Sequence, residues 1–230
     1  AYSGANPFAG FTKFPEMSRS FYLQRADIPI LLSCCPPFLS GMVSDNLYLG
    51  LRAGEARGLL RASFRPEEGV SGYISLNVAD TKGGKLKARH GAYLAAKTAR
   101  IALIPEVRAR MKRQPVTLAH PYFYDADGQP VSKSRLERAI KRAFEAATPR
   151  LAELRGLSLP NFQTLVREAG GFTWHTLRHT AATWDGFEAG FSESELMQKY
   201  RWSDRKMCSR YVHSGDEYAE RAARKRMEVG

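Results

Sequence analysis

The chain has 230 residues, of which 43% are hydrophobic and 25% charged, a balance typical of a folded domain with a sizeable core. No stretch approaches the eighteen or so uninterrupted apolar residues of a membrane helix, and the first residues lack the apolar centre of a signal peptide. We therefore expect a protein of the cytosol or nucleus with no membrane partner. The three cysteines, two of them adjacent, favour neither a disulfide framework nor a zinc site.

The charge of the chain is strongly positive. Lysine and arginine outnumber aspartate and glutamate by 35 to 23, which gives a formal net charge of +12. Between positions 81 and 113, ten basic residues accompany a single acidic one. Such a surface suits a phosphate backbone. Charge alone does not exclude RNA or anionic lipid as the polyanion.

The first part of the chain predicts two helices. One covers residues 27–35, and the next begins at the proline pair 36–37, because proline is tolerated in the first turn of a helix but not in its interior. The second helix has apolar residues at helical spacing and ends at Gly50. A short segment with Arg52 and Glu55 follows.

The pattern then changes to that of a small sheet. From Tyr73, apolar residues alternate with polar ones, which predicts a strand. A second strand at 100–104, stopped by Pro105, completes a small antiparallel sheet near residues 72–104, and the glycine pair 83–84 lies in the polar turn between them. The expected fold class is α+β, mainly α-helical.

The remainder is predicted to be largely helical. A helix capped by Ser132 or Ser134 runs to about residue 147 and presents a basic face outward. Residues 148–172, with two prolines and a glycine pair, are expected to be a looser stretch. Thr173 and Ser192 cap two further helices, and two short helices follow at about 203–212 and 216–228.

His175 and Arg178 are the first candidates for chemistry. They are three residues apart on the helix that Thr173 caps, so both side chains leave the same face. A titratable ring beside a planar, fork-shaped cation suits a phosphate group, although the pair alone is more typical of a solvated helix start. Trp202 and Tyr211 follow, Tyr211 thirty-three residues after Arg178.

Taken in order, these residues resemble the tyrosine recombinase (phage integrase) family. The run from His175 to Thr180, His-Thr-Leu-Arg-His-Thr, is similar to the family's second box. Trp202 stands where some members have tryptophan in place of a second histidine, nine residues before the nucleophile, here Tyr211. Gly50-Leu51-Arg52, with Glu55 three residues later, is similar to the first box. The resemblance covers the chain from about residue 25.

The family also has a catalytic lysine in a β-hairpin, followed by threonine, arginine, an apolar strand and a proline. Lys97 fits this pattern best, because Arg100 and Pro105 follow it at the matching places. Lys82 lies closer to the separation from Arg52 found in compact members. We favour Lys97 and keep Lys82 as the alternative general acid.

The resemblance implies a mechanism in which Tyr211 attacks a DNA phosphate and forms a 3′-phosphotyrosyl bond. Arg52 and Arg178 would bind the phosphate oxygens, and Trp202 would orient one of them. His175 would accept the proton of Tyr211. Because the bond energy is retained in the intermediate, rejoining would need neither ATP nor a metal ion, and no cofactor is expected.

Two further residues receive supporting roles. Glu55 is expected to hold Arg52 or His175 in place without contacting the DNA itself. His179 lies near the site in sequence. Lys97 would protonate the departing 5′ oxygen. The candidate DNA contacts are basic residues of the predicted hairpin and of the helix after Ser132: Lys85, Lys87, Arg89, Arg100, Lys133, Arg135, Arg138 and Lys141.

The resemblance also implies partners and domain organisation. Double-stranded DNA would be the partner, with accessory DNA-bending proteins. The protein would be a monomer alone and a homotetramer on DNA. The tail helix at about 216–228 would pack either into a neighbouring subunit of that tetramer or against its own domain. Residues 1–20 are interpreted as a linker remnant and 21–230 as the catalytic domain, with the family's N-terminal core-binding domain absent from this chain. A cytoplasmic protein, prokaryotic or phage-encoded, is expected.

Three features depart from the family pattern. Arg201 stands where a glycine usually precedes the histidine or tryptophan, Asp185 replaces a commonly apolar residue, and residues 148–172 are longer than usual. Two other functions stay open. A type IB topoisomerase uses a similar residue set to nick and reseal DNA, and a DNA-binding module could carry the same boxes with an idle site.

Overall fold

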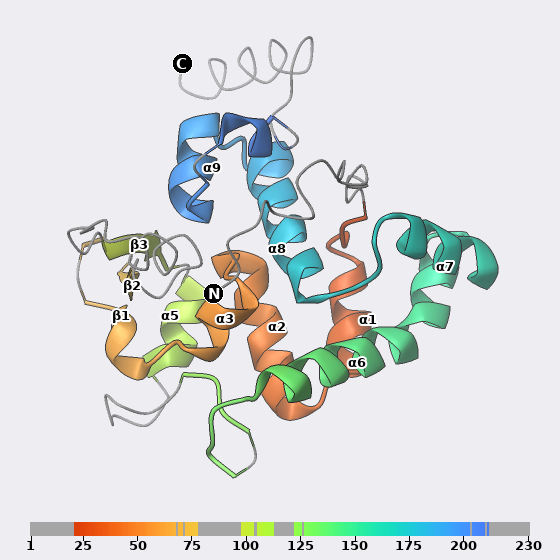
Figure 1. The fold of residues 1–230 in the computed structure, drawn as a ribbon, viewed down its shortest axis with the longest axis horizontal. Coiled ribbons are helices and arrows are strands. Elements are labelled where there is room, and N and C mark those ends of the chain that lie inside the picture. The colour runs from red at the N-terminus through yellow and green to blue at the C-terminus, as the bar shows by residue number, and fades with distance from the viewer. Residues whose placement is uncertain are drawn as a thin grey trace, which may run out of the picture.

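A computed structural model of the chain describes residues 21–67, 69–70, 72–77, 98–103, 105–112, 122–125, 127–202, 204–209 and 211. These residues form a mainly helical molecule with one small antiparallel sheet, which confirms the expected fold class. The sheet lies on one side, the long helix α6 on the other, and the central helices between them (Figure 1). The predicted turn of the hairpin and the tail helix at 216–228 lie outside the described residues. No helix within these ranges is long and apolar enough to cross a membrane.

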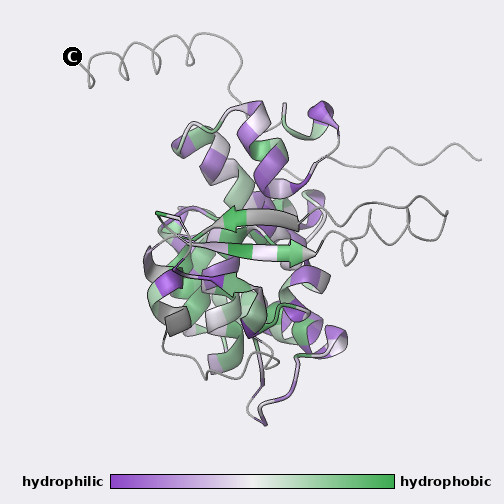
Figure 2. Ribbon diagram, turned by 90° about the vertical axis from the view of Figure 1, so that its left-hand side faces the viewer, coloured by the Kyte–Doolittle hydropathy of each residue, from purple (hydrophilic) through white to green (hydrophobic). Residues whose placement is uncertain are grey.

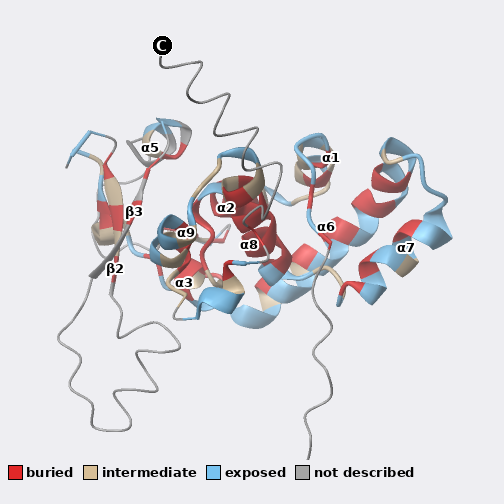
Figure 3. Ribbon diagram, turned by 90° about the horizontal axis from the view of Figure 1, so that it is seen from above, coloured by how far each residue is buried: buried red, intermediate tan, exposed pale blue. Residues whose placement is uncertain are grey.

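Helices α2 (Pro37–Leu49) and α8 (Trp174–Thr183) pack against each other at the centre and are the most continuously buried (Figure 3). Helix α1 (Asp27–Ser33) precedes them, and α2 begins with a proline and ends at Gly50, as the sequence predicts. Gly50 adopts the left-handed conformation, with φ of 58°. That conformation favours glycine because it has no Cβ to clash.

Helix α6 (Lys133–Leu154) is capped by Ser132, whose hydroxyl accepts a hydrogen bond from the Arg135 amide. It continues seven residues beyond its expected end, and α7 (Leu159–Glu168) follows, so the expected looser stretch at 148–172 is wrong. Proline inside a helix costs about 3 kcal/mol. Helix α6 nevertheless passes through Pro149 because the buried face continues beyond it, with Leu151 against the core.

The sheet contains three strands in the order β1 (Phe64–Arg65), β2 (Tyr73–Asn77) and β3 (Thr98–Ala102). All pairs are antiparallel, and Ile74 of β2 stands opposite Ile101 of β3. The hydrophobic residues of β2 alternate with polar ones (Figure 2), which confirms the predicted strand. Strand β1 was missed because two residues show no periodicity. Helix α5 (Pro105–Lys112) was missed because Pro105, expected only as a strand stop, is also its first residue.

Short elements surround the candidate site. Helix α3 (Ala53–Arg57) follows Arg52, and 3₁₀ turn η1 (Arg61–Ser63) leads into the sheet. Helix α8 runs directly into a π-helical turn, η3 (Trp184–Glu188), and Ser192 caps α9 (Glu193–Tyr200) as expected. In place of the longer helix expected at 203–212, the described residues show the 3₁₀ turn η4 (Arg205–Met207).

Candidate active site

The turn that carries Arg52 is held by side chains from other elements. The Leu51 amide donates a hydrogen bond to Oδ1 of Asn46 (2.8 Å), and the indole N–H of Trp174 donates to the Leu51 carbonyl (3.1 Å). A Cβ on Gly50 would lie 2.3 Å from Cε1 of Tyr200, so only glycine allows this close approach between the turn and the end of α9. Arg52 therefore projects from a rigid support.

Arg178 joins that turn to the end of α9. Its guanidinium donates to the carbonyl of Gly50 (2.5 Å) and to the carbonyl of Tyr200, and the side chain is almost fully buried. Burial, the largest cause, and the nearby positive charges of Arg52 and Arg201 together lower the pKa of Arg178 to about 9. The pKa still lies above neutral pH, so Arg178 carries its charge.

Glu55 is shared between two arginines. Its Oε1 accepts from Nη1 of Arg52 (2.9 Å), while Oε2 accepts from the Arg52 amide (2.9 Å) and from Nη2 of Arg201 (2.5 Å). Burial by itself raises the pKa of Glu55, but the charge of Arg201 and the amide and charge of Arg52 outweigh burial and hold the pKa below its usual 4.5. Glu55 is therefore a carboxylate at neutral pH.

These four side chains leave an excess of positive charge. Arg52, Arg178 and Arg201 carry three positive charges around the single negative charge of Glu55, close enough for each arginine to affect the others. The Arg52 side chain is 34% exposed and that of Arg201 only 11%, so Arg52 is the more accessible to a ligand. A guanidinium cluster with surplus charge suits an oxyanion such as phosphate. Among the described residues, no three His, Cys, Asp or Glu side chains could hold a metal ion.

A row of three aromatic rings adjoins the arginines. Trp202 stacks on Tyr200 (ring centroids 4.9 Å apart, planes at 22°) and on Tyr211 (5.2 Å, 13°). The guanidinium carbon of Arg178 lies 5.1 Å from the Tyr200 ring centroid and 5.8 Å from that of Trp202. The aromatic row therefore connects the arginine cluster to Tyr211.

Asp185, one of the departures from the family pattern, fixes the far end of this row. Its Oδ2 accepts from the hydroxyl of Tyr200 (2.5 Å) and pairs with Nζ of Lys199 (2.6 Å). Burial, together with the negative charge of Asp185, raises the pKa of Tyr200 well above 10. Tyr200 therefore stays protonated and acts as a hydrogen-bond donor, which secures the last turn of α9.

Tyr211 is buried, with 6% of its surface exposed. Its hydroxyl lies 2.6 Å from Nδ1 of His179, one helical turn beyond His175 on α8. A Cβ on Gly186, in the π-helical turn η3, would come within 1.8 Å of the Tyr211 carbonyl oxygen. The backbone at Tyr211 thus rests directly on Gly186.

The remaining predicted site residues are His175 and the two candidate lysines. His175 is exposed in the first turn of α8, and it is His179 that contacts the Tyr211 hydroxyl. Lys97 and the alternative Lys82 lie outside the described residues. The same holds for three of the candidate DNA contacts, Lys85, Lys87 and Arg89, and for the side chain of Arg100.

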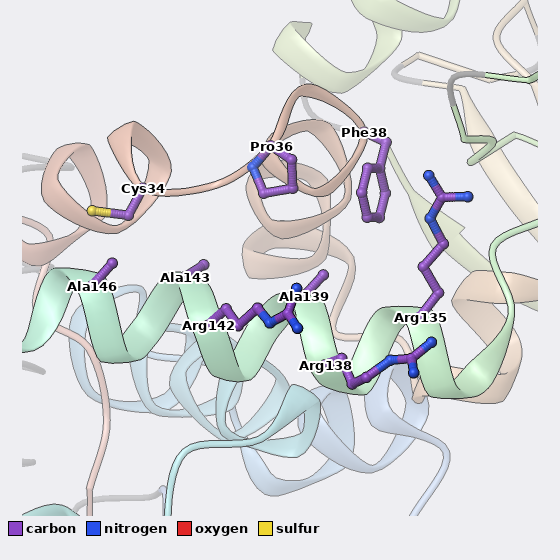
Figure 4. A pocket seen from close by; sticks show the side chains of 9 residues that line it. All are labelled: Cys34, Pro36, Phe38, Arg135, Arg138, Ala139, Arg142, Ala143 and Ala146. Carbon is purple, nitrogen blue, oxygen red and sulfur yellow. The ribbon is translucent and has the colours of Figure 1, made fainter.

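The candidate DNA contacts on α6 are described. Arg135 pairs with Asp125 (2.6 Å), whereas Lys133 and Lys141 are exposed and lie near Glu137 and Glu145. Arg138 and Arg135 line a hollow of about 690 Å³ between α6 and the start of α2 (Figure 4). The hollow is lined by Cys34, Pro36, Phe38, Arg135, Arg138, Ala139, Arg142, Ala143 and Ala146. Its lining therefore combines three arginines with apolar side chains.

Sequence reasoning missed several contributors to the site. Asn46, Trp174 and Tyr200 act through contacts that no local pattern announces. Arg201 was visible only as a departure from the glycine expected at its position. An arginine at a position suited to a left-handed cap is the signal that could have drawn attention to it.

The sequence matches no model of a protein family, and a comparison with curated proteins gives no match. Several solved structures resemble this one. The XerA recombinase is 17% identical, with a TM-score of 0.55 over 93% of this chain and 65% of that chain. The XerH site-specific recombinase bound to its difH substrate is 16% identical, with a TM-score of 0.56 over 90% of this chain and 54% of that one.

The Tn1549 transposon integrase in complex with circular intermediate DNA is 19% identical, with a TM-score of 0.55 over 90% of this chain and 67% of that chain. The chain thus spans about half to two thirds of the length of the proteins it resembles. At these identities the comparison establishes the fold: the chain has the fold of the tyrosine recombinase catalytic domain.

Proposed function

We propose that the chain is the catalytic domain of a site-specific DNA recombinase that cleaves and rejoins DNA through a phosphotyrosyl bond at Tyr211. The observation that carries the proposal is the surplus of guanidinium charge around Glu55, connected by the stacked rings of Trp202 to a buried tyrosine. A solvated basic surface would not gather three arginines, two of them largely buried, around one buried carboxylate. The fold shared with recombinases supports the same conclusion.

In the proposed reaction, Tyr211 Oη attacks the phosphorus of a DNA phosphodiester and the bond to the 5′ oxygen breaks. The phenol proton passes to His175, and the departing oxygen takes a proton from Lys97, or from Lys82 as the alternative. Negative charge grows on the non-bridging oxygens in the transition state. Arg52 and Arg178 would stabilise that charge. Loss of one such donor typically slows a reaction by about a hundred- to a thousandfold.

His179 takes a different part in this scheme. An unperturbed tyrosine has a pKa near 10, so it is a weak nucleophile until a base removes its proton. We assign His179 to holding the hydroxyl in the resting protein, where the two atoms are 2.6 Å apart. The exposed His175 would accept the proton once the ring has moved toward DNA. Reversal of the same steps, with the free 5′ hydroxyl as nucleophile, rejoins the strand without ATP or metal.

The proposed partner is double-stranded DNA, bound as a homotetramer with accessory DNA-bending proteins assisting. On the described surface, the basic face of α6 supports this proposal, because Lys133, Arg138 and Lys141 are exposed along one helix. Arg135 is less suited to DNA, since its guanidinium already pairs with the buried carboxylate of Asp125.

Covalent trapping on DNA tests the function directly. The probe is a pool of duplexes that share a randomised segment with one nick, so that the short cleaved fragment diffuses away and rejoining stops. We expect wild type to form a denaturant-resistant protein–DNA adduct, and Tyr211→Phe to form none. Tyr48→Phe, which removes the hydroxyl of an exposed tyrosine, is the matched control and should keep the adduct.

The same experiment separates the alternative functions. Sequencing the trapped duplexes shows whether one site is enriched. Relaxation of supercoiled plasmid without any enriched site would indicate a type IB topoisomerase instead. DNA binding that persists without any adduct would indicate a binding module with an idle site.

A further inference from the structure

Arg201 occupies a backbone conformation that arginine rarely adopts. It caps α9 in the left-handed region, with φ of 54° and ψ of 44°, and it is the only non-glycine residue with positive φ in the part of the chain that the structure describes. Glycine is the usual residue at such a cap because a Cβ is disfavoured there. A strained residue of this kind persists only where its surroundings hold it, and strain gathers at functional sites.

The side chain explains why an arginine stands there. Nη2 donates to Oε2 of Glu55, and Nη1 donates to the carbonyl of Lys199 (2.8 Å). The side chain is nearly nine-tenths buried, and its Nε has no hydrogen-bond partner among the described residues. Arg201 thus links the end of α9 to a residue 146 positions earlier.

The consequence concerns Arg52. With Glu55 alone, Arg52 would form a one-to-one ion pair whose charges cancel. Because Arg201 occupies Oε2, Glu55 is shared, and Arg52 reaches Oε1 through Nη1 only. The guanidinium of Arg52, whose side chain is about one third exposed, is therefore fixed in orientation while the cluster keeps its surplus charge.

We propose that Arg201 is a positioning residue of the phosphate site: by holding Glu55, it orients Arg52 and leaves positive charge available to a DNA phosphate. This inference rests on the proposed function. It adds a residue that does not touch the reacting atoms and acts through Glu55.

Arg201→Gly is the informative variant, because it relieves the backbone strain while removing the side chain. On the nicked duplex pool we expect adduct formation to slow by about ten- to a hundredfold, less than for loss of a direct donor. Non-covalent binding of the same pool should change by less than about threefold, because a single phosphate contact contributes little of the total affinity. Arg201→Lys keeps the charge but offers one donor group, so its rate should fall between wild type and Arg201→Gly. Arg167→Ala, which removes an exposed charge from α7, is the matched control and should cleave like wild type.

A double variant tests whether Arg201 acts through Glu55. If it does, Arg201→Gly combined with Glu55→Gln should cleave no more slowly than Glu55→Gln alone, because the interaction is already lost. If the double variant lost cleavage rate by the product of the two single-variant factors, Arg201 would not act through Glu55. An Arg201→Gly rate within twofold of wild type would overturn the role of Arg201 itself.

A second readout does not depend on cleavage. The probe is inorganic phosphate, compared with sodium chloride at equal ionic strength. An anion that binds the folded cluster raises the melting temperature by mass action, and we expect Arg201→Gly to show less than about half of the wild-type rise, with Arg167→Ala unchanged. If wild type forms no adduct, the proposed function fails. If phosphate raises the melting temperatures of wild type and Arg201→Gly equally, this inference fails, whether or not wild type forms the adduct with DNA.

Discussion

The hydroxyl of Tyr211 lies 2.6 Å from Nδ1 of His179, and the two rings meet edge to face with centroids 5.2 Å apart. The contact closes the small core cluster that Tyr211 forms with the end of α8 and with α9. In the proposed reaction, a tyrosine held in this way has to leave His179 before its hydroxyl can attack a DNA phosphate. The described arrangement therefore corresponds to the resting state of that proposal.

Chemical labelling should reveal this burial. We expect tetranitromethane to nitrate Tyr211 at least about tenfold more slowly than Tyr48, because a ring that reacts only in a minor open state reacts in proportion to that state's population. Tyr48 is the internal control, since 37% of its surface is exposed. Peptide mass spectrometry gives both rates in one sample. In His179→Ala the rate at Tyr211 should rise toward that at Tyr48; equal rates for the two tyrosines in wild type would contradict the resting arrangement.

Acid should remove the contribution of Glu55 to stability. The pKa of Glu55 is lower in the folded protein than its usual 4.5, so the unfolded chain binds the proton first as the pH falls. Its stabilisation is therefore complete above about pH 4.5 and is lost as the pH falls through the lower, folded-state pKa. We expect urea unfolding to show wild type more stable than Glu55→Gln at pH 6, with the difference shrinking at pH 3.

Glu137→Gln is the control for loss of a carboxylate from an ion pair. Glu137 lies on the exposed face of α6, 3.7 Å from Lys133, and such pairs contribute about 1 kcal/mol or less. Glu137→Gln should therefore differ little from wild type in stability. A gap between wild type and Glu55→Gln that stayed constant from pH 6 to pH 3 would contradict the account of Glu55.

The sequence predicted the local parts of the site better than the long-range ones. Gly50 as a helix stop and Ser192 as a cap were predictable because each depends on its own backbone. The link between Arg201 and Glu55 was not predictable, because it joins residues 146 positions apart and requires a backbone conformation that arginine disfavours. The π-helical turn at Gly186 was not predictable either, because its hydrogen bonds span only one residue more than those of an α-helix, and a single such turn leaves no pattern in the sequence.

Gly186→Ala should disturb the placement of Tyr211. The added Cβ would meet the Tyr211 carbonyl oxygen at 1.8 Å, so backbone must shift, and overpacking of this kind typically costs about 1–3 kcal/mol. We expect a lower free energy of unfolding and faster nitration of Tyr211 than in wild type. Gly54→Ala is the matched control, since nothing lies within 4 Å of its added Cβ and alanine is the better helix former. Equal stability of Gly186→Ala and wild type would show that Tyr211 does not rest on this turn.

Arg178→Lys should show that the buried guanidinium holds two segments together. A lysine ammonium lacks the planar fork that reaches the carbonyls of Gly50 and Tyr200 at once, so at least one buried carbonyl loses its donor. Such a loss costs about 1–3 kcal/mol, which for a domain of this size lowers the melting temperature by about 2–12 °C. Arg167→Lys on the exposed face of α7 should melt like wild type. Because the Arg52 turn and the end of α9 would then separate, Arg178→Lys should also lose the phosphate-dependent rise in melting temperature. A variant that melts at the wild-type temperature and keeps that rise would show that the site requires only a positive charge, and not the hydrogen bonds to both carbonyls.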